Sequence, residues 1–115
     1  MRLLALLIFA LPLPAFADGF EIVRDRNAFV SLVKGKNLKR MGITLQVTSD
    51  GKIAGRALGQ PVSGAWKWSG GYFCRDLAWG KQDLGPNCQA VKIKGSVIRF
   101  ISDRGTGEYA DLRVE

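Results

Sequence analysis

Hydrophobic and polar residues alternate in short runs along most of the chain. In residues 43–48, Ile43, Leu45 and Val47 alternate with polar side chains, and in residues 62–68 every second position from Val62 to Trp68 faces one way. Successive side chains of a β-strand point to opposite faces of its sheet. The two runs therefore predict strands with one face toward a core, and this face includes both tryptophans of 62–68.

Seven short β-prone runs, of which these two alternate most clearly, follow one another from residue 43 to residue 114. Their connections are rich in glycine, with proline, asparagine and aspartate, which are typical turn residues, and the longest of them is a predicted loop at 80–87. In one run we expect Ile98 and Phe100 to face inward, because Arg99 lies on the other face. Short antiparallel strands at regular spacing indicate a mainly β fold, a barrel or sandwich of about seven strands with the simple order of a meander. The predicted strands are 43–48, 52–58, 62–68, 72–79, 88–94, 97–102 and 108–114.

A single short helix precedes these strands. Asp25 is a typical N-cap, Phe29, Leu32 and Val33 fall on one helical face, and Lys34 followed by a glycine is a helix stop. The next residues, 34–40, hold four basic side chains. We interpret this basic segment as a solvated linker in preference to an anion-binding loop.

The first residues have the pattern of a secretory signal peptide. A positive start is followed by the apolar stretch 3–13 and by the small-x-small sequence Ala15-Phe16-Ala17. The apolar stretch is too short for a membrane-spanning helix, which needs about 20 residues. We expect residues 1–17 to be removed and residues 18–115 to form a single soluble domain in the periplasm or outside the cell.

Cys74 and Cys88 are the only cysteines of the chain. An even number of cysteines in a small exported protein predicts disulfide bonding, because the compartment is oxidising. Closing a loop of about 15 residues would stabilise the fold by roughly 3 kcal/mol. We therefore expect a Cys74–Cys88 disulfide and no reactive thiol.

The charge and the missing residue types limit the function. Without Arg2 the chain has 16 basic and 10 acidic side chains, a charge of +6, and it has no histidine. The lack of histidine excludes Ser-His-Asp and Cys-His catalysis and removes the commonest metal ligand. No catalytic residue, metal site or cofactor is predicted, nucleic acid is not an expected partner of an exported protein, and we expect a monomer.

Two groups of residues are candidates for binding. Trp79, Lys81, Gln82 and Asp83 would be presented on the loop that the disulfide holds. The second group, Arg75, Arg99 and Arg104, lies on or beside strands near that loop, and guanidinium groups suit carboxylate or phosphate ligands. The pair Asp76 and Asp83 is the one arrangement that suggests a hydrolase.

The motifs "GQPVSGAWKWSGGYFCRDLAWG", "GPNCQAV" and "IRFISDRGTG" resemble those of small exported alphaproteobacterial proteins. More distantly, the chain is similar to the uncharacterised domain family DUF995, with glycine-rich turns and a tryptophan before the first cysteine. This resemblance covers about residues 43–114, implies a small β domain and brings no catalytic residues. The label dihydrodipicolinate reductase, sometimes attached to such proteins, has no support, since the dinucleotide-binding motif is missing.

These observations favour a non-catalytic binding or interaction module of the periplasm. Its expected partner is an envelope protein, a peptide or an anionic envelope component. The alternatives are a periplasmic inhibitor of a protease or lysozyme and, less favoured, a small hydrolase.

Overall fold

Nine strands and two short helices follow one another along residues 18–115, the part of the chain that this computed structural model describes. The predicted signal peptide, residues 1–17, lies outside the described residues. The elements are β1 (Glu21–Ile22), α1 (Arg26–Val33), β2 (Leu38–Arg40), β3 (Ile43–Val47), β4 (Lys52–Ala57), β5 (Gln60–Ser69), β6 (Tyr72–Trp79), β7 (Gln82–Lys94), β8 (Val97–Ile101), α2 (Ser102–Gly105) and β9 (Tyr109–Val114).

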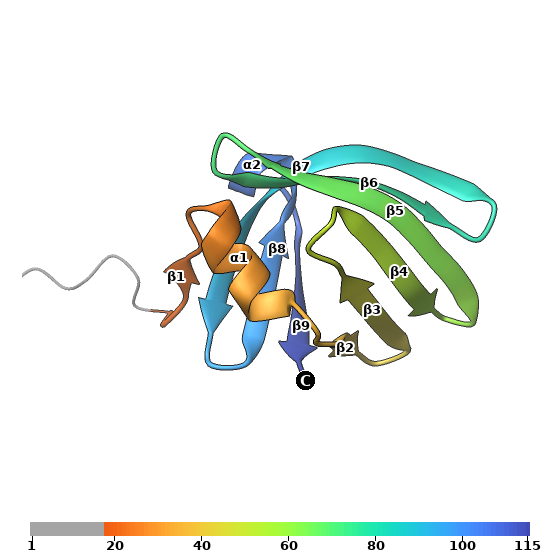
Figure 1. The fold of residues 1–115 in the computed structure, drawn as a ribbon, viewed down its shortest axis with the longest axis horizontal. Helices are drawn as coiled ribbons and strands as arrows, with labels where there is room; N and C mark the ends of the chain where they lie inside the picture. Colours follow the sequence, from red (N-terminus) through yellow and green to blue (C-terminus); the bar gives the residue numbers. More distant parts are fainter. Residues whose placement is uncertain (1–17) are drawn as a thin grey trace, which may run out of the picture.

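The strands from β2 to β9 form a closed antiparallel barrel (Figure 1). Each strand pairs with the next along the chain, and β9 returns to pair with β2, so the order is a meander. The extra strand β1 pairs with the second half of β7. The prediction of a small, mainly β antiparallel fold with a short N-terminal helix is confirmed, with eight barrel strands and one extra strand in place of about seven.

One additional strand, β2, and the first half of β7 lie where a linker and a loop were predicted. The basic segment 34–40 is not simply a solvated linker, because it contains β2, whose Leu38 is 1% exposed. The predicted loop 80–87 is also wrong, since Gly80 and Lys81 form a tight turn and β7 begins at Gln82. The first half of β7 pairs with β6 alone, so its other edge is free. Proline, which has no backbone N–H to donate, is tolerated in such an edge segment, and Pro86 lies there.

Two glycines inside strands allow the sheet to bend. A Cβ atom on Gly55 would overlap the carbonyl oxygen of Thr44, and one on Gly64 would overlap the carbonyl oxygen of Asp76. The neighbouring backbone therefore approaches more closely at these positions than any side chain would permit. Both glycines are on the inward-facing register of β4 and β5, so they also leave space inside the barrel.

Helix α1 closes one end of the barrel. The Asp25 side chain accepts a hydrogen bond from the backbone N–H of Ala28 at 2.8 Å, which confirms the predicted N-cap. Phe29 is fully buried, and its ring centroid lies 4.9 Å from that of Phe73 and 5.1 Å from that of Trp66. Because these two partners lie near the β5–β6 turn, the helix covers the barrel at that end.

The inward faces agree with the predicted alternation. Ile98 and Phe100 are 0% and 8% exposed, Trp66 is 6% exposed, and Trp68 packs against the same core. The predicted disulfide between Cys74 and Cys88 joins β6 to β7. It lies on the outer face, because the residues beside Cys74 in β6 are the ones that face inward.

Candidate functional site

A cavity of about 320 Å³ lies inside the barrel. Its volume is at the lower end of the range for small-molecule sites, about 300–1,000 Å³. The buried part of its wall is almost entirely apolar, and strands on all sides of the barrel contribute to it. The buried apolar residues of the wall are Leu38, Val47, Ile53, Phe73, Phe100 and Leu112.

Five residues with polar side chains also line the cavity: Arg75, Gln89, Ser102, Glu108 and Tyr109. Gln89 is the only buried polar residue among those described, at 8% exposure, whereas Arg75 and Ser102 are half-buried and Glu108 is exposed. The cavity therefore has an apolar buried part and a polar part closer to solvent. This arrangement is typical of a site that orients an apolar molecule through one polar end.

The connection between β8 and β9 forms part of the cavity opening. It contains α2, a single turn in which Asp103 and Arg104 have left-handed backbone angles, with φ of 56° and 54°. The side chain of Asn87 donates a hydrogen bond to the Asp103 carboxylate at 2.8 Å and accepts one from the Asp103 backbone N–H at 2.9 Å. This reciprocal pair fixes a backbone conformation that non-glycine residues adopt at a cost of about 1–3 kcal/mol each.

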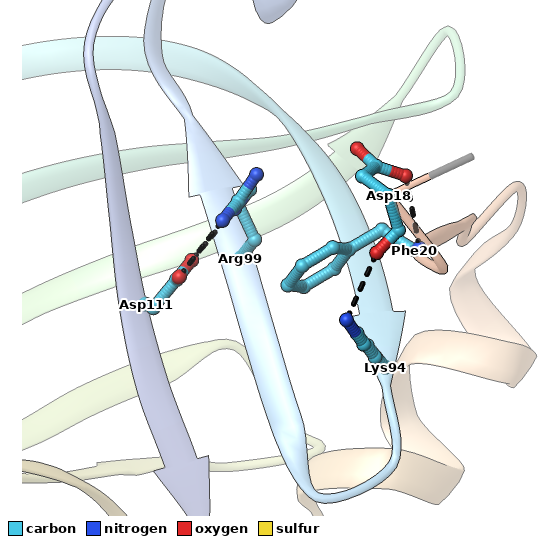
Figure 2. A network of polar contacts seen from close by, with 5 residues as sticks. All are labelled: Asp18, Phe20, Lys94, Arg99 and Asp111. Atoms are coloured by element: carbon cyan, nitrogen blue, oxygen red, sulfur yellow. Dashed lines mark hydrogen bonds and ion pairs between the residues drawn. The ribbon is translucent and has the colours of Figure 1, made fainter. Parts of the chain in front are cut away.

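The structure separates the three arginines that were candidates for one anion site. Arg75 lies inside the barrel, because it shares the inward face of β6 with Phe73. Arg99 lies outside, where its guanidinium bonds both carboxylate oxygens of Asp111 at 2.8 and 3.0 Å (Figure 2). Arg104 is in the turn at the opening, 5.8 Å from the ring centroid of Tyr72. Only Arg75 and the backbone around Arg104 belong to the region of the cavity.

Arg99 is already satisfied by contacts within the chain. Its guanidinium carbon is 4.0 Å from the ring centroid of Phe20 and 3.9 Å from that of Tyr109, so it lies between two aromatic rings. The hydrogen bond to Asp111 raises the pKa of Arg99 and lowers the pKa of the Asp111 carboxyl, against a smaller opposing effect of burial. Figure 2 shows how Phe20 lies beside this pair. Nearby, the ammonium of Lys94 donates a hydrogen bond to the backbone carbonyl of Asp18 at 2.9 Å. This cluster fastens the N-terminal segment to the barrel.

The other candidate residues lie around the β6–β7 turn. Trp79, Lys81 and Gln82 line a shallow surface hollow beside the β4–β5 turn. The indole N–H of Trp79 donates to the carbonyl of Ala57 at 2.7 Å, and its ring packs against the core. Asp83 accepts a hydrogen bond from the backbone N–H of Gly85 at 2.9 Å. Trp79 and Asp83 therefore have structural contacts, Lys81 and Gln82 are exposed, and none of the four lines the barrel cavity.

The structure does not bring the two candidate catalytic carboxylates into one cavity. Asp76 lies on the outer face of β6, opposite Pro86, in a groove of about 340 Å³ that also contains the disulfide. Asp83 lines neither this groove nor the barrel cavity. In residues 18–115, no group of three or more histidine, cysteine, aspartate or glutamate side chains is arranged to hold a metal ion.

The barrel cavity itself was not predicted from the sequence. One local signal was present, because Arg75 alternates in phase with Phe73 and Leu77, and an inward arginine on a core strand requires a polar partner or solvent. Gln89 is likewise in phase with the fully buried Val91. The volume between them depends on all eight strands, which no single run of residues reveals.

No protein-family model, curated protein or solved structure matches the chain. None of the helices within residues 18–115 has the length and apolar character to cross a membrane.

Proposed function

We propose that this protein is a non-catalytic binding module of the periplasm or extracellular space, and that its site is the cavity inside the barrel. The observation that carries the proposal is the cavity of about 320 Å³ with its buried apolar wall and a few polar groups toward the opening. A preformed apolar space of this kind gains free energy when a small molecule transfers its apolar surface from water into it.

Two further observations support this function. The Cys74–Cys88 disulfide suits an oxidising compartment outside the cytoplasm. The chain also contains no histidine, the commonest general base of enzymes. The proposed site differs from the partner surface that the sequence suggested, because it is the interior of the barrel and the expected partner is a small molecule.

A fluorescence titration tests this function. The oxidised chain 18–115 is titrated with N-phenyl-1-naphthylamine, a neutral apolar dye that becomes fluorescent in a dry environment. We expect saturable binding of one dye molecule per chain. The variant Ala110→Leu, which adds a larger side chain to the cavity wall, should reduce this binding by at least about tenfold.

The control makes the same substitution on the outer face. Ala54 lies in the middle of β4 and is exposed, so Ala54→Leu should bind the dye as the unchanged protein does. If Ala110→Leu does not fold by circular dichroism, Leu45→Phe reduces the same cavity from β3. Equal dye binding by the folded cavity variant and the surface variant, or no saturable binding at all, would show that the cavity is not a binding site.

A further inference from the structure

Among the described residues that line the barrel cavity, Arg75 is the one with a cationic side chain. Arg75 lies in the middle of β6, where it pairs with Trp66 of β5 on one side and Asn87 of β7 on the other. Its side chain is half-buried. The rigid barrel thus holds one positive charge beside the apolar cavity.

This charge has no carboxylate partner among the described residues. One nitrogen of the Arg75 guanidinium donates to the carbonyl of Gly85 at 2.7 Å, and no ion pair within residues 18–115 involves Arg75. Its chain neighbour Asp76 points to the opposite face of the strand. Burial lowers the pKa of Arg75 more than the charge of Asp76 raises it. The free protein therefore pays a desolvation cost that an anion in the cavity would offset.

Two neutral polar groups reach the cavity together with Arg75. Within residues 18–115, the Gln89 side-chain amide makes one hydrogen bond, a long one of 3.4 Å to the hydroxyl of Ser102, although the residue is only 8% exposed. Buried amides normally use most of their hydrogen-bonding capacity. By contrast, the amide of Asn87 makes two short hydrogen bonds with Asp103, one donated and one accepted. Gln89 and Ser102 thus retain capacity for a polar ligand.

The chemistry of these groups favours a carboxylate as the polar end of the ligand. A guanidinium offers parallel N–H donors that match the two oxygens of a carboxylate, and such charge-assisted bonds are stronger than neutral ones. Glu108 lies at the exposed part of the wall and contributes a negative charge. One cation with an anion nearby suits a single negative charge better than two, because like charges repel.

The cavity also limits the size of the apolar part. The volume of about 320 Å³ is at the lower end of the range for small-molecule sites, about 300–1,000 Å³, so the ligand is a small molecule. The buried part of the wall has one polar side chain, that of Gln89 opposite Phe73, and its other residues are apolar. A linear chain of about eight to ten carbons with one terminal carboxylate is a small molecule that suits a site of this volume.

We infer that the barrel cavity binds amphipathic monocarboxylates of medium length, with the carboxylate held by Arg75 and the chain in the apolar part. Gln89 and Ser102 position the carboxylate by hydrogen bonds. This inference rests on the proposed function, since it names the ligand class of the same cavity.

The test displaces N-phenyl-1-naphthylamine from the unchanged protein with three ligands of equal chain length. These are decanoate, 1-decanol and decyltrimethylammonium, which carry a negative charge, no charge and a positive charge. All ligands are used below their micelle concentrations. We expect decanoate to bind at least about tenfold more tightly than 1-decanol, as for a charge-assisted hydrogen bond, and the cation to bind most weakly.

The variant Arg75→Gln should remove the preference for decanoate over 1-decanol. Arg56→Gln is a matched control, because Arg56 is exposed on β4 and its guanidinium likewise donates to a glycine carbonyl, that of Gly59, at 2.7 Å. This control should keep the preference.

The possible failures are distinguishable. No saturable dye binding overturns the proposed function and this inference with it. Dye binding without a preference for decanoate over 1-decanol overturns the inference alone, and so does a preference that persists in folded Arg75→Gln. If Arg75→Gln does not fold, the comparison of the three ligands on the unchanged protein decides the question.

Discussion

Helix α1 provides the sharpest test of how the barrel is closed, because its attachment depends on very few residues. The helix has eight residues, and only Phe29 and Val33 of these are buried. Isolated helices shorter than about 12–15 residues are marginal in water, so α1 owes its stability to packing on the barrel. The ring of Phe29 packs against Trp66, Trp68 and Phe73 at centroid distances of 5.1, 5.3 and 4.9 Å.

The substitution Phe29→Ala removes this aromatic contact and leaves a void that the rigid barrel cannot fill. The cost for a fully buried phenylalanine is about 3–5 kcal/mol. A domain of this size has a total stability of about 5–15 kcal/mol, so the loss is a large fraction of it. With a urea dependence of about 1–3 kcal/mol per molar, the unfolding midpoint should fall by at least about 1 M.

Urea unfolding followed by tryptophan fluorescence measures this change. The control Ser31→Ala alters an exposed residue of the same helix and should change the stability by less than about 0.5 kcal/mol. A loss below about 1 kcal/mol in Phe29→Ala would refute the reasoning, because it would mean that α1 does not contribute to the closed core.

Three further predictions concern the Cys74–Cys88 disulfide, the N-cap of α1 and the stability in acid. Replacing Cys74 and Cys88 together by serine should reduce the free energy of unfolding by roughly 3 kcal/mol in urea titrations, and an unchanged midpoint would contradict the loop-entropy argument. Asp25→Ala should cost about 1 kcal/mol through loss of the N-cap, whereas Asp25→Ser should retain most of it. Arg99 lowers the pKa of the Asp111 carboxyl in the folded protein. The ion pair therefore stabilises the fold above the pKa that Asp111 has in the unfolded chain, and this stabilisation is lost as the pH falls through the pKa of Asp111 in the folded protein. The urea midpoint should therefore drop more between pH 7 and pH 3 in the unchanged protein than in Asp111→Asn. Equal drops would contradict a stabilising role of the Arg99–Asp111 pair.

The sequence predicted the parts of the fold that depend on local alternation. Trp66 was assigned to the core from the two-residue period of its strand, and Ile98 and Phe100 because Arg99 lies between them on the other face; all three are buried. The cap at Asp25 was also predictable, since it needs only a side chain three residues before the N–H that it binds.

The elements that were missed depend on pairing between distant parts of the chain. Strand β2 has three residues, and two of them are basic, so its alternation is too short to recognise. It exists because β9 and β3 pair with it on both sides. The start of β7 contains Gly85 and Pro86, which are typical of turns, but an edge segment with one paired side tolerates both.

The candidate site was predicted least well, for a related reason. Arg75, Arg99 and Arg104 were predicted to form one group because they lie on or beside strands near the disulfide loop. Each strand, however, presents its residues on two faces of the sheet. Arg75 faces the cavity while Arg99 faces solvent, and this difference follows from the position of each in its strand. The cavity arises from the closure of all the strands together.

Intermolecular nuclear Overhauser effects between decanoate and the methyl groups of the protein test the central claim most directly. If the barrel cavity is the binding site, contacts should appear between the ligand chain and the methyls of Leu45, Ile53 and Leu112, which line it from three different strands. The outward methyl of Ala54 should show none. Contacts confined to Ala54 or to other outward-facing methyls would contradict binding inside the barrel.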